Sequence, residues 1–239
     1  MVERRRRVFV VVLLALFVLA GTIYESLQRD STVEQTVSVT VDDQKFANAE
    51  IDKIEIKGRA PKTGYSRGMF GSGWAEFDGC DTRNIILKRD LTDQTVDQTN
   101  NCHVLSGKLN DPYTGMRIDF VRGAGTSSKV QIDHVVALSD SWQKGAQNLS
   151  EDNRIKFAND PLNLLAVDGP ANQKKGDGDA ATWLPPHKDY RCRYVARQIA
   201  VKVKYMLWAT KAEIEAMKRI LSTCPAQLLP VQADSDEPG

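Results

Sequence analysis

The sequence of 239 residues has only three histidines and four cysteines, and its formal net charge is only +1. It shows no internal repeat, no HExxH zinc-protease pattern and no P-loop pattern. These absences exclude a repeat protein, the common zinc proteases and P-loop nucleotide hydrolases. Hydrophobic residues make up 41% of the chain and charged residues 26%, which excludes an intrinsically disordered or fibrous protein.

A long hydrophobic run occurs only at the N-terminus. Arg4–Arg7 precede a wholly apolar run from Val8 to Ala20, which fades towards Tyr24. A basic block followed by such a run is typical of a signal peptide, while its extension to Tyr24 reaches the lower length limit for a membrane-spanning helix. We therefore expect residues 1–24 to be a signal peptide or a signal anchor. In both cases the rest of the chain is extracellular, either secreted or anchored to the cytoplasmic membrane.

The even number of cysteines agrees with export. Their spacing fits no compact metal-binding knuckle, so disulfides are the expected state, with four buried thiols as the alternative. Three pairings are open. The pairing of sequence neighbours, Cys80 with Cys102 and Cys192 with Cys224, closes modest loops, and each bond would stabilise the fold by about 3 kcal/mol in the chain-entropy model.

Composition divides the chain further. Residues 25–60 are polar and poor in aromatics, which indicates a spacer with a possible strand at 36–41 and a first packed piece at 51–56. We expect a domain over residues 61–224 and a flexible C-terminal tail over 225–239. Patterns within the domain predict both helices and strands, and so an α+β fold. Helices are expected from Asp81 or Thr82, across 140–160 with a break near Gly145, from Asp168 to Gly176, and at 189–208 and 211–221; strands are expected at 129–136 and 160–167, with a hairpin at 102–115.

Four polar residues lie in an informative order on this layout. Asp133 and His134 end the strand in IDHVVAL, Asn163 lies in NDPLNLLAV, and Asn172 follows nine residues later in ANQKKGD. With these motifs the chain resembles the HNH endonucleases, also called His-Me finger or ββα-metal nucleases. A weaker resemblance to a secreted, disulfide-containing branch extends over residues 61–224, through GYSRGMFGSGW, CDTRNIILKRDL and ATWLPP.

The resemblance implies a ββα-metal core embellished by helices, and hydrolysis of phosphodiester bonds. His134 would be the general base, and Asp133 with Asn172 would hold one divalent cation, Mg²⁺ or alternatively Mn²⁺. Asn163 would orient His134 by binding the backbone of its loop. Adjacent residues on a regular strand point to opposite faces, so the strand must bend or end at His134.

Basic residues complete the predicted site. Lys175, three residues after Asn172, is expected to hold a phosphate oxygen, and Lys174 and Arg83 to contact the substrate. Structural alternatives stand beside these roles: a buried Asp133–His134 pair, a turn cap at Asn163, a solvated lysine run, and Arg83 paired with a nearby acid.

The expected partner is nucleic acid, DNA in preference to RNA, read with low sequence specificity. From Lys129 to Thr223 there are 15 Lys/Arg against 11 Asp/Glu, which permits phosphate binding without demanding it. No obligate protein partner is implied, and a membrane partner only if the N-terminal segment is retained. The alternative function is an exported cell-surface binding module that keeps the fold without catalysis.

Overall fold

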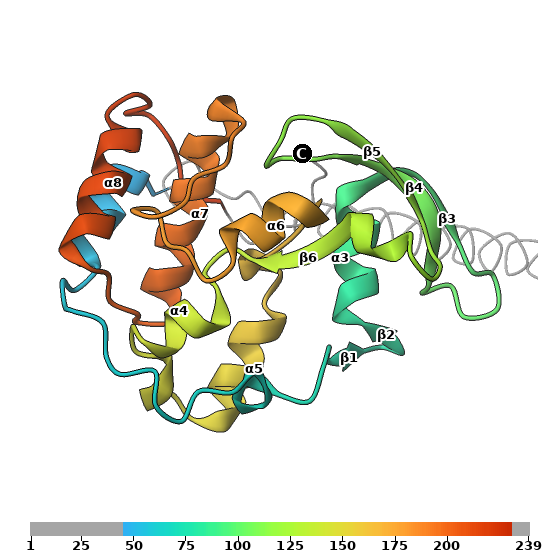
Figure 1. The fold of residues 1–239 in the computed structure, drawn as a ribbon, viewed down its shortest axis with the longest axis horizontal. Helices are drawn as coiled ribbons and strands as arrows, with labels where there is room; N and C mark the ends of the chain where they lie inside the picture. Colours follow the sequence, from blue (N-terminus) through green and yellow to red (C-terminus); the bar gives the residue numbers. More distant parts are fainter. Residues whose placement is uncertain (1–44, 231–239) are drawn as a thin grey trace, which may run out of the picture. The chain divides into compact units, whose positions relative to one another are not determined.

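An antiparallel hairpin followed directly by a helix lies at the centre of the computed structural model, which describes residues 45–230 (Figure 1). Strand β6 (Val130–His134) pairs with β7 (Leu164–Asp168), with His134 opposite Leu164. Strand β7 runs into α6 (Gly169–Lys175), because Asp168 accepts a hydrogen bond from the backbone N–H of Ala171 at 2.8 Å and caps the helix. The predicted cap and short helix are therefore present, whereas the strand expected at 160–167 begins only at Leu164, after a 3-10 turn (Pro161–Asn163).

The connection between β6 and β7 carries the helical material expected there. It forms α4 (Leu138–Trp142), a 3-10 turn (Ala146–Asn148) and α5 (Glu151–Asn159). The break falls at Gly145, whose φ of 121° lies in the region that favours glycine, and a Cβ there would lie 3.2 Å from the Trp208 ring. Helix α5 brings the carbonyl of Ala158 over the end of β6.

A three-stranded antiparallel sheet lies to one side of β6 in Figure 1. Its order is β3 (Leu91–Val96), β4 (Val104–Asn110) and β5 (Arg117–Val121), and α3 (Thr82–Asp90) packs against it. The sequence predicted a hairpin at 102–115, and the structure extends it to three strands. A short ladder of β1 (Glu76–Phe77) and β2 (Cys80–Asp81) precedes α3, which Asp81 caps.

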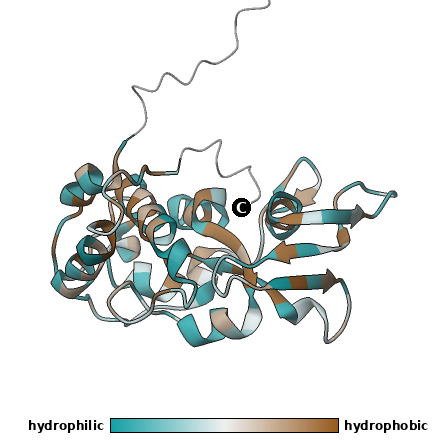
Figure 2. Ribbon diagram, turned by 90° about the horizontal axis from the view of Figure 1, so that it is seen from above, coloured by the Kyte–Doolittle hydropathy of each residue, from teal (hydrophilic) through white to brown (hydrophobic). Residues whose placement is uncertain are grey.

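Helices α7 (Arg191–Lys204) and α8 (Lys211–Leu221) lie on the other side of the hairpin (Figure 1). Their core includes α2 (Ala47–Glu50) and the following 3-10 turn (Ile51–Lys53), so part of the expected spacer packs with the domain. Helices α7 and α8 carry both polar and apolar residues (Figure 2), and their apolar residues pack into the core. Among residues 45–230, no helix is long and apolar enough to cross a membrane. The predicted N-terminal membrane segment, the strand at 36–41 and residues 231–239 lie outside the described residues.

Both disulfides join sequence neighbours. Cys80 is bonded to Cys102, which ties β2 to the segment before β4, and Cys192 is bonded to Cys224, which ties α7 to the end of α8. Of the three pairings that the sequence leaves open, the structure has the one between sequence neighbours, and the expected disulfide state is confirmed.

A buried charge cluster joins α4, α7 and α8. The Lys144 ammonium lies 2.6–2.7 Å from carboxylate oxygens of Asp140, Asp179 and Glu213, and all four side chains are buried. Lys202 contacts Glu213 at 3.0 Å, and Arg59 contacts Asp140 at 2.9 Å. The three carboxylates are thus paired with three cations, Lys144, Lys202 and Arg59. This pairing offsets the free-energy cost of removing the charges from water.

Candidate active site

His134 is the last residue of β6, and its ring is held by a backbone carbonyl from α5. Its Nε2 lies 2.9 Å from the Ala158 carbonyl oxygen. A carbonyl only accepts hydrogen bonds, so Nε2 carries the ring proton and Nδ1 carries a lone pair. Nδ1 has no hydrogen-bond partner within residues 45–230, and it is not among the polar atoms sealed from solvent. The ring is therefore fixed in the tautomer that can accept a proton at Nδ1.

The surroundings keep this imidazole neutral. The residue is only 6% exposed, and burial is the main cause that lowers the pKa of His134 to about 3. The hydrogen bond to Ala158 raises this pKa, and the positive charge of Arg67 lowers it further. The Trp74 indole stacks on the ring, with centroids 5.7 Å apart and planes inclined by 13°. His134 is thus unprotonated at neutral pH.

His134 lines a pocket of about 320 Å³. The other walls come from Leu138, Ala158, Trp74 and the glycine-rich segment 67–73. Arg67 belongs to the lining and brings a positive charge to a site that holds no carboxylate among its lining residues. The pocket therefore combines a proton acceptor with a cation that favours an anionic ligand.

Asp133 has partners other than those of His134, as expected for its neighbour on a strand. One carboxylate oxygen of Asp133 lies 2.9 Å from the Lys175 ammonium, and the other accepts a hydrogen bond from the Tyr113 hydroxyl. Lys175 also donates to the His134 carbonyl oxygen at 2.8 Å. Burial raises the pKa of Asp133, while Lys175 and Tyr113 oppose this. The ammonium joins α6 to the end of β6.

These contacts bear on the predicted metal site. The Asn172 side-chain amide donates to the Gln131 side chain at 2.9 Å, and its Oδ1 has no partner in the described part of the chain. Both oxygens of Asp133 are engaged, however, and its charge is neutralised by Lys175. No group of three or more His, Cys, Asp or Glu that could hold a metal occurs within residues 45–230. Asp133 and Asn172 do not fit a cation in this arrangement, and Lys175 would have to leave Asp133 first.

Asn163 is the last residue of the 3-10 turn that precedes β7, and its side chain holds the segment that follows His134. Its Oδ1 accepts from the backbone N–H of Val136 at 2.9 Å, and its Nδ2 donates to the carbonyl of the same residue at 3.3 Å. The side chain is fully buried. This geometry supports an orienting role and not a turn cap, and the effect on catalysis stays a prediction.

The remaining predicted substrate residues are more dispersed. The Lys175 side chain is fully buried, so a contact with phosphate would require its pair with Asp133 to open. Lys174 is exposed on α6. Arg83 donates to the Val130 carbonyl at 3.2 Å and does not line the His134 pocket. Burial, together with the nearby Arg122, lowers the pKa of Arg83.

Sequence reasoning did not identify Arg67 or Trp74 as site residues, although both lie in the glycine- and aromatic-rich stretch that begins at Pro61. The same stretch contains GYSRG, a match to the GxSxG pattern of serine hydrolases. Ser66 is exposed there and precedes a 3-10 turn (Arg67–Phe70), whereas the hydrolase pattern requires a strand followed directly by a helix. This match does not form a nucleophile site.

Comparison with known proteins places the domain in a nuclease class. Residues 81–220 match the family described as GmrSD restriction endonucleases, C-terminal domain, and the chain belongs to this family. The match includes Asp133, His134, Asn163 and Asn172, and it confirms the predicted resemblance. A protein of Arthroderma benhamiae described as an uncharacterized secreted protein is 38% identical over 181 residues, which cover 74% of this chain and 84% of that protein. No solved structure matches the chain.

Proposed function

We propose that this protein is an exported HNH endonuclease that hydrolyses phosphodiester bonds of nucleic acid, with DNA preferred and sequence specificity low. The observation that carries the proposal is the His134 ring: a backbone carbonyl fixes its tautomer, Nδ1 is left free, and the ring lines a pocket that also holds Arg67. Membership of the nuclease family supports the reaction class. The order of β6, β7 and α6 supports a ββα-metal core.

In the proposed reaction a backbone phosphate enters the pocket beside Arg67. Its negative charge stabilises the imidazolium and so raises the pKa of His134 towards the range useful for a general base. Nδ1 then takes a proton from the water that attacks the phosphorus, the bond between the phosphorus and the 3′ oxygen breaks, and the released 3′ oxygen takes a proton from solvent water. The Ala158 carbonyl keeps the ring aimed while the positive charge develops on it. Asn163 holds the chain after His134 in place through Val136. The expected products carry 5′-phosphate and 3′-hydroxyl ends.

A divalent cation, Mg²⁺ or Mn²⁺, remains a separate part of the proposal. Such an ion would supply charge at the phosphoryl and leaving oxygens. The free Asn172 oxygen supports it, whereas the ion pair of Asp133 with Lys175 does not. We assign no proton or bond-breaking step to a metal.

Export is also proposed. Two disulfides and the description of the Arthroderma benhamiae relative as secreted support an extracellular site of action. The N-terminal segment would provide secretion or anchoring.

An exported binding module without catalysis is the second candidate. The specific observation that favours it is the closure of the predicted metal site by Lys175, together with the strong burial of His134. Incubation of the purified protein with plasmid DNA and with RNA, in Mg²⁺, Mn²⁺ or EDTA, separates the two. Cleavage supports the nuclease, and binding without cleavage under every ion supports the module. Loss of cleavage in EDTA would show that a metal enters the site.

A further inference from the structure

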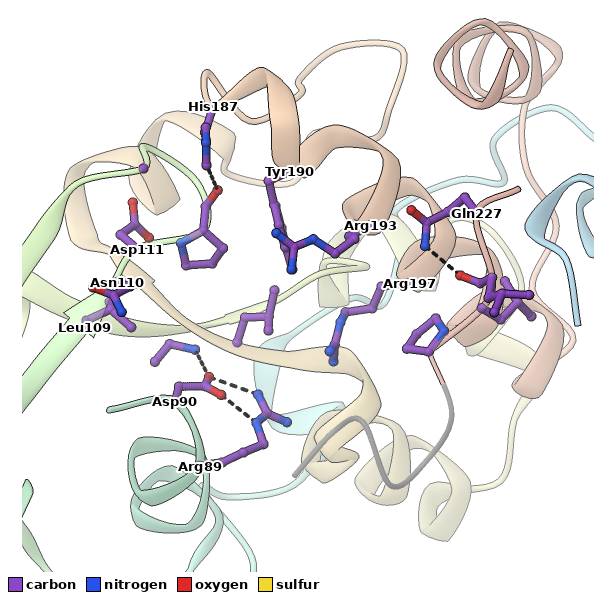
Figure 3. Close-up of a pocket in the computed structure, with 17 residues that line it drawn as sticks. Arg89, Asp90, Leu109, Asn110, Asp111, His187, Tyr190, Arg193, Arg197 and Gln227 are labelled. Atoms are coloured by element: carbon purple, nitrogen blue, oxygen red, sulfur yellow. Dashed lines mark hydrogen bonds and ion pairs between the residues drawn. The ribbon is translucent and has the colours of Figure 1, made fainter. Parts of the chain in front are cut away.

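A second pocket of the described domain is separate from His134. It measures about 550 Å³ and shares no lining residue with the His134 pocket (Figure 3). Its walls are the outer edge of β7, the turn after β4, helix α7 and residues 227–230. A volume of this size lies within the range of small-molecule sites.

The two acidic residues of this pocket, Asp90 and Asp111, already have contacts within the protein. Arg89 forms a two-pronged ion pair with Asp90, at 2.6 and 2.9 Å, and Asp90 also accepts from the backbone N–H of Ala166 at 2.7 Å. Asp111 accepts from the backbone N–H groups of Thr114 and Asp168, at 2.7 and 2.9 Å. Asp90 is thus paired with a cation, whereas Asp111 is held by hydrogen bonds and has no cation partner among residues 45–230.

Three donors from α7 and the residue before it are left without anionic partners. Tyr190, Arg193 and Arg197 are spaced by three and four residues, so they share one helical face. Figure 3 shows their side chains extending into the pocket from this helix. The Arg193 guanidinium lies 5.3 Å from the centre of the Tyr190 ring and has no ion pair or hydrogen bond with any residue from 45 to 230.

Two of these residues are nine-tenths buried, and each has donor atoms without a protein partner that remain open to the pocket. Tyr190 is 8% exposed, and its hydroxyl has no hydrogen-bond partner in the described domain. Arg197 is 9% exposed; its Nη1 donates to the Leu162 carbonyl at 3.1 Å, while Nε and Nη2 have no protein partner among the residues described. These donor atoms are not among the polar atoms sealed from solvent without a partner, so they are open to the pocket and can donate to a ligand with several acceptor oxygens.

We infer that this pocket binds a nucleotide, with its phosphate on Tyr190, Arg193 and Arg197 and its base or sugar against the apolar walls. Guanidinium groups favour phosphate because they donate two parallel hydrogen bonds. Leu165, Leu228 and Leu229 provide apolar surface beside them. The choice of a nucleotide over other phosphate compounds rests on the proposed nuclease function. The ligand is either a free mononucleotide or the phosphorylated end of a strand, and both offer the same group.

The test measures binding of thymidine 5′-monophosphate by isothermal titration calorimetry, because this compound has no phosphodiester bond and is not a nuclease substrate. We expect a dissociation constant below about 1 mM. Arg193→Gln should weaken binding about tenfold or more, and Tyr190→Phe, which keeps the ring, by about threefold to tenfold. Arg219→Gln on the exposed face of α8 removes the same charge elsewhere and should leave binding unchanged.

Two comparisons identify the ligand source and the bound group. Thymidine and inorganic phosphate should both bind more weakly than the nucleotide, and equal affinity for inorganic phosphate would overturn the nucleotide assignment. A 5′-phosphorylated oligonucleotide, compared with its 5′-hydroxyl form on the His134→Gln protein, shows whether a strand end enters. No saturable binding of thymidine monophosphate, or binding unaffected by Arg193→Gln, would refute the site. Plasmid cleavage without nucleotide binding would refute the nucleotide site and leave the proposed nuclease function intact. Nucleotide binding without plasmid cleavage would support the site and refute the nuclease function.

Discussion

The buried neutral state of His134 should be visible as a pH dependence of stability. In the folded protein the pKa of His134 is lowered from 6.5 to about 3, so between these values the unfolded chain binds a proton that the folded chain does not. Stability is therefore unaffected by this group above pH 6.5 and falls as pH drops below it. The slope approaches about 1.4 kcal/mol per pH unit, which gives a loss of about 2 kcal/mol between pH 7.5 and pH 5.

The assay compares the wild-type protein with His134→Gln. The glutamine amide can still donate to the Ala158 carbonyl but does not titrate. Unfolding free energies from urea titrations at pH 7.5, 6.5, 5.5 and 5.0 are subtracted between the two proteins, so that the shared carboxylates cancel. The stability of the wild type relative to the variant should fall by about 2 kcal/mol over this range. A difference in unfolding free energy that stays constant with pH would show that the His134 ring has the same pKa in the folded and unfolded protein. That result would refute the burial of a neutral His134.

Three further substitutions test the contacts around the site. Lys175→Met leaves the Asp133 carboxylate buried without its cation, so urea unfolding should show a loss of about 3–5 kcal/mol, smaller at low pH where Asp133 can protonate; an unchanged midpoint would contradict a buried ion pair. Asn163→Ala removes both hydrogen bonds to Val136, whereas Asn163→Asp keeps the acceptor, so the cleavage rate of Asn163→Ala should fall further than that of Asn163→Asp. Equal rates for the two variants would show that Asn163 has no orienting role. Lys144→Met should cost at least about 3 kcal/mol in the same unfolding assay because three buried carboxylates lose their shared cation, and a loss under 1 kcal/mol would show that the cluster is hydrated.

Local signals were sufficient for the elements that surround the site. Helix α8 has the predicted bounds, because its apolar spacing and the Thr210 cap both lie in the local sequence. Helix α6 begins at its predicted cap, Asp168, and ends at Gly176. The even cysteine count indicated disulfides, but it left three pairings open, and the fold selects the pairing of sequence neighbours because each loop closes between adjacent elements.

Features that depend on distant partners were not predictable in the same way. Strand β3 has a polar sequence with four consecutive exposed residues, so it shows no alternation and is stabilised by pairing with β4. Lys175 lies in a run that indicates a solvated face, yet Asp133 and the His134 carbonyl draw it into the core. Ala47, Ile51 and Ile54 come from a polar segment, and their burial depends on α7 and α8. The burial of such residues depends on contacts with parts of the chain that are distant in sequence, and the neighbouring sequence does not indicate these contacts.

The central claim is that the His134 imidazole is the proton acceptor in phosphodiester hydrolysis. The most direct measurement is the rate of plasmid nicking by the wild type, His134→Gln and His103→Gln under the divalent ion that gives the highest rate. His103 is exposed at the hairpin and serves as the matched control. We expect His134→Gln to nick plasmid at least about a hundredfold more slowly than the wild type while remaining folded, and His103→Gln to nick at the wild-type rate. Equal rates for wild type and His134→Gln would contradict it.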